Sequence, residues 1–238
     1  MGGHAVASIF VNPLQFGPNE DFGDYPRTLN SDLELLEAQG CDVVFTPAGR
    51  DFVPADFTTK ISVGGVGEDH CAKSRPQFFD GVATIVTKLL NVFSPDFAVF
   101  GEKDYQQLMV ITRLVRDLDL DIEIIGAPTV RENDGLAMSS RNQYLSQVER
   151  TQAPKLFEIL NLAAERIALG SEDWKDIQKW AIARLKGAGF ANVDYINYVD
   201  ATSLEPIASA DQPGRLLAAA WMGKTRLIDN IPIARQIS

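Results

Sequence analysis

Two adjacent hydroxyls and an arginine lie close together near the middle of the chain and are suited to bind phosphate. Residues 129–142 read TVRENDGLAMSSRN, so Ser139, Ser140 and Arg141 follow a glycine-containing turn. Hydroxyl and guanidinium groups donate hydrogen bonds to phosphate oxygens, and the guanidinium also neutralises their charge. The loop follows an apolar, strand-like run, and in open α/β sheets ligands bind beyond the carboxyl ends of the strands. This position predicts a nucleotide site; the alternative is that Ser139 or Ser140 only caps a helix.

A second polar cluster follows another predicted strand and precedes a predicted helix. Residues 101–107 read GEKDYQQ. Gly101 permits a ligand to approach the backbone closely, and the free N–H groups at the start of a helix favour an anion. The Lys103 ammonium adds a mobile positive charge that can follow a phosphate as charge develops. The alternative, of equal weight when the cluster is taken alone, is a solvated turn that caps the helix.

The third cluster lies just past the first predicted strand. Asn12, Gln15 and Tyr25 belong to a polar loop that is too long to be a simple connection. Two side-chain amides can bind a small polar acid through its carboxylate and hydroxyl groups. Taken alone, the cluster fits better as an ordinary turn in which Asn12 and Gln15 satisfy the backbone. Three such clusters at one sheet edge, however, favour a shared ligand site.

Short apolar segments alternate with amphipathic segments through the first half of the chain. The predicted strands are residues 4–11, 42–45, 97–100 and 122–125. The predicted helices are residues 29–39, 80–93 (capped by Asp80) and 106–118, and residues 58–66 alternate as an edge strand or hairpin would. This order predicts an α/β fold with a Rossmann-like, doubly wound parallel sheet.

The pattern changes after Arg141. Ser146 and Glu149 form a capping box that begins a helical region, and Pro154 must bend or restart that region. The elements predicted next are a helix over residues 173–186 and strands over 193–198 and 216–221. We expect a smaller C-terminal α+β lid domain over residues 130–238, after an N-terminal domain over 1–129.

Composition argues against several classes of protein. The 238 residues carry a formal charge of −10, which disfavours nonspecific nucleic-acid binding. No apolar run approaches the ~18 residues of a membrane span, and the first residues lack the basic and apolar regions of a signal peptide. Cys41 and Cys71 are spaced neither as metal ligands nor as a CxxC motif, which favours reduced thiols in the cytoplasm.

The polar clusters, together with several other strings, resemble the pantoate–β-alanine ligase (pantothenate synthetase) family. The strings are SIFVNP with QFG and YPRT, GVATIV, FGEKD, TVRE, DGLAMSSRN and the terminal GKTRLIDN. They follow the family's order over nearly the whole chain. The resemblance implies that ATP adenylates the carboxylate of pantoate with release of pyrophosphate. β-Alanine then attacks the acyl adenylate, which gives pantothenate and AMP.

The resemblance also implies the partners. We expect ATP with Mg²⁺ as a co-substrate, no tightly bound prosthetic group, and a cytoplasmic homodimer that binds neither nucleic acid nor membrane. Carried over position by position, the residues that bind pantoate and β-alanine are Asn12, Gln15, Tyr25, Arg75 and Gln107. The ATP-binding residues are Gly101, Glu102, Lys103, Asp104, Val130, Met138, Ser139, Ser140 and Arg141. The catalytic groups are Lys103, Ser139, Ser140 and Arg141, because fixed donors and cations stabilise the charge on the α-phosphate.

The sequence departs from the family in two places. Phe78 stands where the family commonly has His. The family also begins with a strand and a Met-Gly-x-x-His-x-Gly-His motif, whereas the match here begins at the second strand, which His4 opens. We expect the first βα unit to be missing from the sheet. Three explanations compete, namely a mis-set start codon or engineered fragment, a degenerate protein, and a gap filled by another chain, and we favour the first. We expect this chain alone to show little ATP–pyrophosphate exchange. The alternative function is a catalytically impaired fragment that binds pantoate or nucleotide, or only dimerises.

Overall fold

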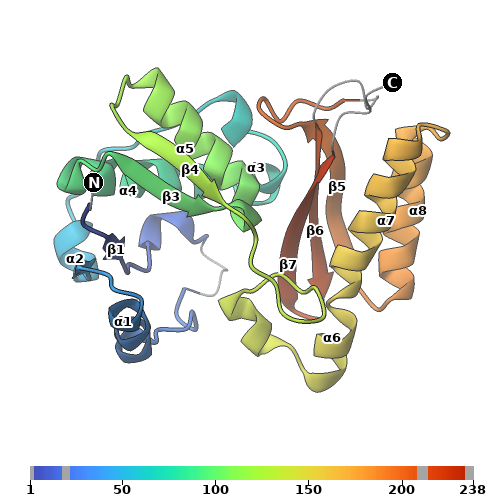
Figure 1. Cartoon of the computed structure of the whole chain (residues 1–238), viewed down its shortest axis with the longest axis horizontal. Helices are drawn as coiled ribbons and strands as arrows, with labels where there is room; N and C mark the ends of the chain where they lie inside the picture. The colour runs from blue at the N-terminus through green and yellow to red at the C-terminus, as the bar shows by residue number, and fades with distance from the viewer. Residues whose placement is uncertain (1–2, 18–21, 208–213, 234–238) are drawn as a thin grey trace.

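The chain folds into two halves that lie side by side, one built on parallel strands and one on an antiparallel sheet (Figure 1). The computed structural model describes residues 3–17, 22–207 and 214–233. The elements of the first half are β1 (Val6–Ser8), α1 (Leu29–Ala38), β2 (Val43–Phe45), α2 (Gly49–Phe52), α3 (Cys71–Ser74), α4 (Phe78–Phe93), β3 (Phe97–Gly101), α5 (Tyr105–Asp117) and β4 (Glu123–Ala127). Those of the second half are α6 (Gln147–Gln152), α7 (Lys155–Leu169), α8 (Trp174–Gly187), β5 (Asn192–Asp200), β6 (Gly214–Met222) and β7 (Thr225–Ile233).

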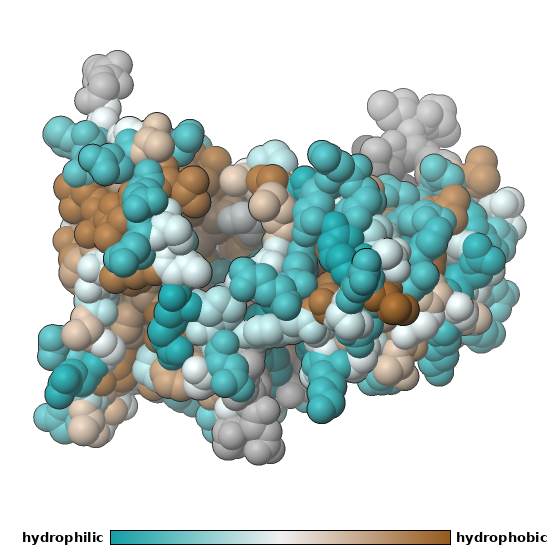
Figure 2. Space-filling view, turned by 90° about the horizontal axis from the view of Figure 1, so that it is seen from below, coloured by the Kyte–Doolittle hydropathy of each residue, from teal (hydrophilic) through white to brown (hydrophobic). Residues whose placement is uncertain are grey.

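The strands of the first half form two parallel pairs, β1 with β2 and β3 with β4. Helices α4 and α5 pack together through the apolar faces that their helical periodicity predicts, and Val82, Val86, Ile111 and Leu114 are buried between them. The helices meet the side of the strands to which Ala98 and Ile124 project. The alternate residues Phe97, Val99 and Ile125 remain exposed, and Figure 2 shows apolar surface gathered over this end of the molecule.

The sheet of the second half is antiparallel, in the order β5–β6–β7. Helices α7 and α8 cover one of its faces (Figure 1). The other face packs against the first half, where Val199, Leu204 and Leu217 join Tyr105, Leu108 and Val110 in one apolar cluster. Because both faces are covered, nearly every residue of β6 is buried. The two halves therefore share a core.

The α/β fold class is confirmed, as are the local signals of the second half. Ser146 and Glu149 form the predicted capping box of α6, and Pro154 restarts the chain as the N-cap of α7. Asp173 caps α8 through a bond from the Lys175 N–H. The division at residues 129/130 remains a prediction.

Several predictions were wrong in detail. Residues 58–66 form no strand; the N–H of Ile61 donates to the Thr84 hydroxyl of α4 at 2.9 Å instead of to a neighbouring strand. Asp80 lies in the first turn of α4, which begins at Phe78, because Gln77 takes the cap position. The first strand is shorter than residues 4–11, since β1 pairs with β2 only over Val6–Ser8. Strand β7 was not predicted.

Two segments named in the sequence analysis lie partly outside the described residues. Part of the polar loop after the first strand, residues 18–21, lies outside the described residues, as do residues 1–2 before His4. Among the helices of the described ranges, none combines the length and apolar character that crossing a membrane requires.

Candidate active site

A cleft of about 750 Å³ lies between the two halves and gathers most of the predicted site residues. Those that line it are Gln15, Tyr25, Arg75, Lys103, Asp104, Gln107, Met138, Ser139, Ser140 and Arg141. Four predicted residues lie outside its wall, namely Asn12, Gly101, Glu102 and Val130. Asn12 instead borders a smaller cavity of about 130 Å³, together with Gln15 and Gln107. The three polar clusters therefore do meet at one place.

The turn after β1 holds Gln15 in a fixed position. The buried Asn12 accepts a bond from the Leu14 N–H at 3.0 Å and donates to Gln15 Oε1 at 3.2 Å and to the Gly81 carbonyl at 3.0 Å. The turn packs so closely on α4 that a Cβ at Gly81 would lie 2.3 Å from the Leu14 carbonyl oxygen. Asn12 thus satisfies backbone, as the structural alternative predicts, and the same bonds orient the Gln15 carboxamide.

Arg75, the C-cap of α3, joins this turn from the segment between α3 and α4. Its guanidinium donates to the Gln15 carbonyl at 3.1 Å and lies 3.8 Å from the centre of the Phe78 ring. A cation over an aromatic face is stabilised by the ring's quadrupole. Phe78 therefore helps to fix Arg75 at the cleft.

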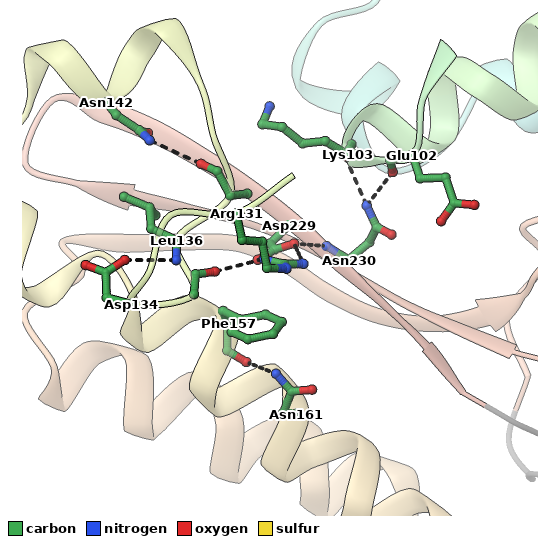
Figure 3. Close-up of polar contacts among 12 residues, drawn as sticks. Glu102, Lys103, Arg131, Asp134, Leu136, Asn142, Phe157, Asn161, Asp229 and Asn230 are labelled. Atoms are coloured by element: carbon green, nitrogen blue, oxygen red, sulfur yellow. Dashed lines mark hydrogen bonds and ion pairs between the residues drawn. The ribbon is translucent and has the colours of Figure 1, made fainter. Parts of the chain in front are cut away.

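The second cluster forms a 3₁₀ turn, Glu102–Asp104, between β3 and α5. The Lys103 ammonium lies 3.6 Å from the Asp104 carboxylate, and its side chain is half-buried in the cleft wall. The Glu102 carboxylate is held by Arg215 of β6 at 2.7 Å. Asn230 of β7 donates to the carbonyls of both Glu102 and Lys103 (Figure 3).

The loop after β4 is a tight hairpin that leads into a second 3₁₀ turn, Ser140–Tyr144. The Met138 N–H donates to the Val130 carbonyl at 3.0 Å, so both residues are fixed although their side chains are exposed. Ser139 caps the turn by accepting a bond from the Arg141 N–H at 3.3 Å. That capping role is the structural alternative foreseen for Ser139, and it brings Ser140 and Arg141 to the cleft.

Tyr25 connects this loop to the first half of the chain. The Ser140 hydroxyl lies 3.3 Å from the Tyr25 hydroxyl, and the Arg141 guanidinium lies 5.4 Å from the centre of the Tyr25 ring. Tyr144 adds a bond from its hydroxyl to the Asp24 carbonyl at 3.1 Å. The segment around Tyr25 thus forms one wall of the site against the Ser140–Arg141 loop.

Ion pairs outside the cleft stiffen the hairpin. Arg150 of α6 donates to Glu132 at 2.5 Å and to Asp134 at 2.6 Å. The bond from Arg150 is the main reason that the pKa of Asp134 lies below its ordinary value. Asn142 donates to Glu132 at 2.9 Å and to the Ala137 carbonyl at 3.1 Å. The loop is therefore braced at both ends.

Several residues of the site were not foreseen from the sequence. Asn230 and Arg215 bond across the two halves to the turn at Glu102, and Asp229 and Arg131 bond to each other within the second half. Arg226, Asp194 and Cys71 also line the cleft. The string LIDN contributed to the family resemblance, but it carried no assigned role. In the described parts of the chain no cluster of three or more His, Cys, Asp or Glu side chains is arranged to hold a metal ion.

Comparison with known proteins shows which family the chain is similar to. A family model described as pantoate-beta-alanine ligase matches residues 2–232. Pantothenate synthetase of Pseudomonas savastanoi pv. phaseolicola is 48% identical over 97% of this chain and 82% of that protein. The enzyme of the same name from Paramagnetospirillum magneticum is 52% identical over 96% of this chain and 80% of its own.

Solved structures are similar as well. Pantothenate synthetase from Thermus thermophilus superposes with a TM-score of 0.92 at 41% identity, covering 97% of this chain and 84% of that one. Pantoate-beta-alanine ligase from Francisella tularensis, complexed with beta-gamma ATP and beta-alanine, gives a TM-score of 0.79 at 33% identity, over 96% and 79% of the two chains.

Proposed function

The chain belongs to the pantoate–β-alanine ligase family, and from that premise we propose how its cleft carries out the reaction. The chain condenses pantoate with β-alanine at the expense of ATP and forms pantothenate. In the first step a carboxylate oxygen of pantoate bonds to the α-phosphorus of ATP, and pyrophosphate leaves. In the second step the β-alanine amine attacks the acyl carbon, and AMP leaves with the bonding electron pair.

The two acids occupy the end of the cleft formed by the turn after β1. Gln15, held by Asn12, and Gln107 of α5 bind pantoate from two sides with their carboxamides. Arg75 binds a carboxylate with its guanidinium fork, which Phe78 supports. Tyr25 closes this end toward the nucleotide.

ATP lies between the 3₁₀ turn at Glu102–Asp104 and the loop at Met138–Arg141. Asp104 borders the phosphates from the cleft wall. Gly101, Glu102 and Val130 lie outside that wall, so their part in the site is limited to backbone contacts with the nucleotide, and the Glu102 carboxylate is held by Arg215. Lys103, Ser139, Ser140 and Arg141 are the catalytic groups, because their donors and positive charges stabilise the charge that develops at the α-phosphate. β-Alanine is itself the nucleophile, so no covalent enzyme intermediate is needed.

Mg²⁺ enters this scheme with the nucleotide. The cleft offers the Asp104 carboxylate, paired with Lys103 at 3.6 Å, and the described residues form no larger ligand cluster. Such a donor set fits Mg²⁺ that is held mainly by phosphates and water, with one carboxylate from the protein. A homodimer in the cytoplasm, supported by the family resemblance, completes the proposal.

One observation carries the assignment: Lys103 of the first half and Ser140–Arg141 of the second line a single cleft with Gln15 and Gln107. Pantoate-dependent exchange of labelled pyrophosphate into ATP tests the first step, and an exchange rate that matches that of a full-length relative would contradict the low exchange expected from the sequence. Pantothenate formed on addition of β-alanine tests the second. Exchange that does not require pantoate would contradict the proposal, and ATP binding without exchange would identify a binding protein instead of a ligase.

A further inference from the structure

Two consecutive residues of β7 are bonded to the two opposite walls of the cleft. Neighbouring side chains of a strand project to opposite faces of the sheet. Asn230 therefore reaches the turn that carries Lys103, and Asp229 reaches the hairpin that leads to Ser139–Arg141 (Figure 3). Both residues are almost fully buried, with 3% and 4% of their surface exposed. They border the cleft, yet their polar atoms are engaged within the protein.

The Asn230 carboxamide uses both of its N–H groups on the Lys103 turn. Its Nδ2 donates to the Glu102 carbonyl at 2.8 Å and to the Lys103 carbonyl at 3.0 Å. Its Oδ1 accepts a bond from Arg215 Nε at 2.7 Å, and Arg215 also binds the Glu102 carboxylate at 2.7 Å. The Arg215 guanidinium lies 3.6 Å from the centre of the Tyr105 ring. The backbone on both sides of the Lys103 peptide is thereby fixed to β7.

The Asp229 carboxylate holds the opposite wall through Arg131. Arg131 donates two bonds to it, at 2.7 and 2.8 Å, and a third to the Gly135 carbonyl at 3.0 Å. The guanidinium lies 3.8 Å from the centre of the Phe157 ring. Gly135 has a φ of +92°, and a Cβ there would lie 2.6 Å from the same ring. The hairpin at the base of the Ser139–Arg141 loop is therefore fixed in position and shape.

Asp229 Oδ1 also accepts a bond from the Asn230 N–H at 2.7 Å, which joins the two networks at one peptide. Consecutive Cα atoms are ~3.8 Å apart, so this peptide sets a nearly invariant spacing between the two anchor points. A surface ion pair at the rim of the cleft would hold them less firmly, because it is mobile and screened by water.

We propose that Asp229 and Asn230 are positioning residues that fix the spacing between Lys103 and the Ser139–Arg141 loop, so that both sides meet the same phosphates. This inference rests on the proposed function of the cleft. Displacement of a catalytic group by about 1 Å costs on the order of 100-fold in rate, so a small shift of either wall is enough to impair adenylation.

Asn230→Asp tests the role of Asn230 with little change in volume. A carboxylate has no N–H donors, so the variant loses both bonds to the Lys103 turn while an acceptor for Arg215 remains. We expect pantoate-dependent ATP–pyrophosphate exchange to fall by ~100-fold. Amide formation from supplied pantoyl adenylate and β-alanine should change by less than about threefold, because it does not need the phosphate geometry that the two walls set.

Gln178→Glu is the matched control. Gln178 of α8 likewise donates from its carboxamide to a backbone carbonyl, that of Ile196 at 2.6 Å, but it lies outside the cleft wall. We expect its exchange rate to stay within about twofold of the unaltered chain. Hydrogen–deuterium exchange of the backbone amides of residues 102–104 should rise in Asn230→Asp and not in Gln178→Glu.

The outcomes separate this inference from the proposed function. Exchange at the unaltered rate in Asn230→Asp, or an equal loss in Gln178→Glu, would overturn the positioning role alone. An equal loss in both half-reactions of Asn230→Asp would mean a general structural role and would also overturn it. Absence of calorimetric ATP binding by the unaltered chain would overturn the proposed function and this inference with it.

Discussion

The hydroxyls of Tyr25 and Ser140 lie 3.3 Å apart although the two residues are 115 positions apart in the chain. This contact connects the loop after the first strand to the loop that is proposed to cover the phosphates. Both residues line the cleft, and the Tyr25 ring also faces the Arg141 guanidinium. The pantoate end and the ATP end of the site therefore share one aromatic side chain.

Two variants of Tyr25 separate its contributions. Tyr25→Phe keeps the ring beside Arg141 but loses the hydroxyl, and we expect exchange to fall by ~5- to 10-fold, the value of one neutral hydrogen bond. Tyr25→Ala also loses the ring, so its exchange rate should fall further. Thr112→Val is the control, because it removes a hydroxyl that bonds the Leu108 carbonyl at 2.8 Å outside the cleft wall. An identical loss in all three variants would argue against a specific role for Tyr25.

Lys103 is predicted to act at the phosphates. Lys103→Met keeps the length of the side chain and removes its charge, and we expect the rate of adenylation to fall by ~100-fold or more. Lys60→Met is the control, because Lys60 pairs with Asp80 at 2.9 Å at the surface, outside the cleft wall. Steady-state exchange, followed as ATP is raised to saturation at saturating pantoate, measures the maximal rate and the KM for ATP of both variants. A change in the KM for ATP alone would assign Lys103 to binding and not to catalysis.

Gly81 provides a stability test of the turn that holds Gln15. Gly81→Ala would place a Cβ 2.3 Å from the Leu14 carbonyl oxygen, a backbone atom that must shift. We expect a loss of ~1–3 kcal/mol in the free energy of unfolding and a raised KM for pantoate. Gly187→Ala in α8 meets nothing within 4 Å and should be neutral or stabilising by up to ~1 kcal/mol. Urea unfolding compares the two variants.

The buried His70 ring is expected to make the free energy of unfolding depend on pH. Burial is the main cause that lowers the pKa of His70 below its ordinary value of 6.5. Its Nδ1 accepts a bond from Asn197 at 2.7 Å and its Nε2 lies 3.1 Å from the Leu204 carbonyl, so the neutral ring suits the fold. Below pH 6.5 the unfolded chain binds a proton at His70 more readily than the folded chain does. The stability that the neutral His70 ring contributes is therefore complete above pH 6.5 and decreases as the pH falls toward the folded-state pKa.

The difference in Tm between about pH 7.5 and pH 5 should therefore be smaller in His70→Asn than in the unaltered chain. Asn tolerates the positive φ of 55° at this position better than most residues. His4→Asn, a change at an exposed ring, should leave the difference as it is. An unchanged difference in His70→Asn would mean that other groups cause the pH dependence.

The helices and the three polar clusters could be predicted because their signals are local. The apolar face of α4 and the capping box at Ser146 are repeats and pairs within a few residues. Residues 58–66 were predicted wrongly because their alternation reflects contact with α4, to which Thr84 supplies a hydrogen bond, and not pairing with a strand. Alternation identifies a two-sided segment but does not say what covers each side.

Strand β7 was missed for a related reason. Asp229 and Asn230 interrupt its apolar pattern, and a buried carboxylate in a strand is unfavourable until a partner such as Arg131 is known. That partner lies 98 positions away. Asn12 and Ser139 show the converse case, since both make the turn and cap bonds expected of structural residues. Ser139 also lines the cleft, and Asn12 orients Gln15 in its wall. For each residue, the structural interpretation and the ligand-site interpretation were not exclusive.

The apolar cluster shared by the two halves limits how the substrates can enter. A hinge that opened the cleft by rotating the halves apart would expose Val110, Val199 and Leu217, each now almost fully buried. Exposing apolar surface costs ~25 cal/mol per Å², so wide rigid-body opening is rare at equilibrium. Entry and product release must therefore depend on smaller movements of the segments around Tyr25 and Ser140. The shared core keeps the catalytic walls in register between cycles.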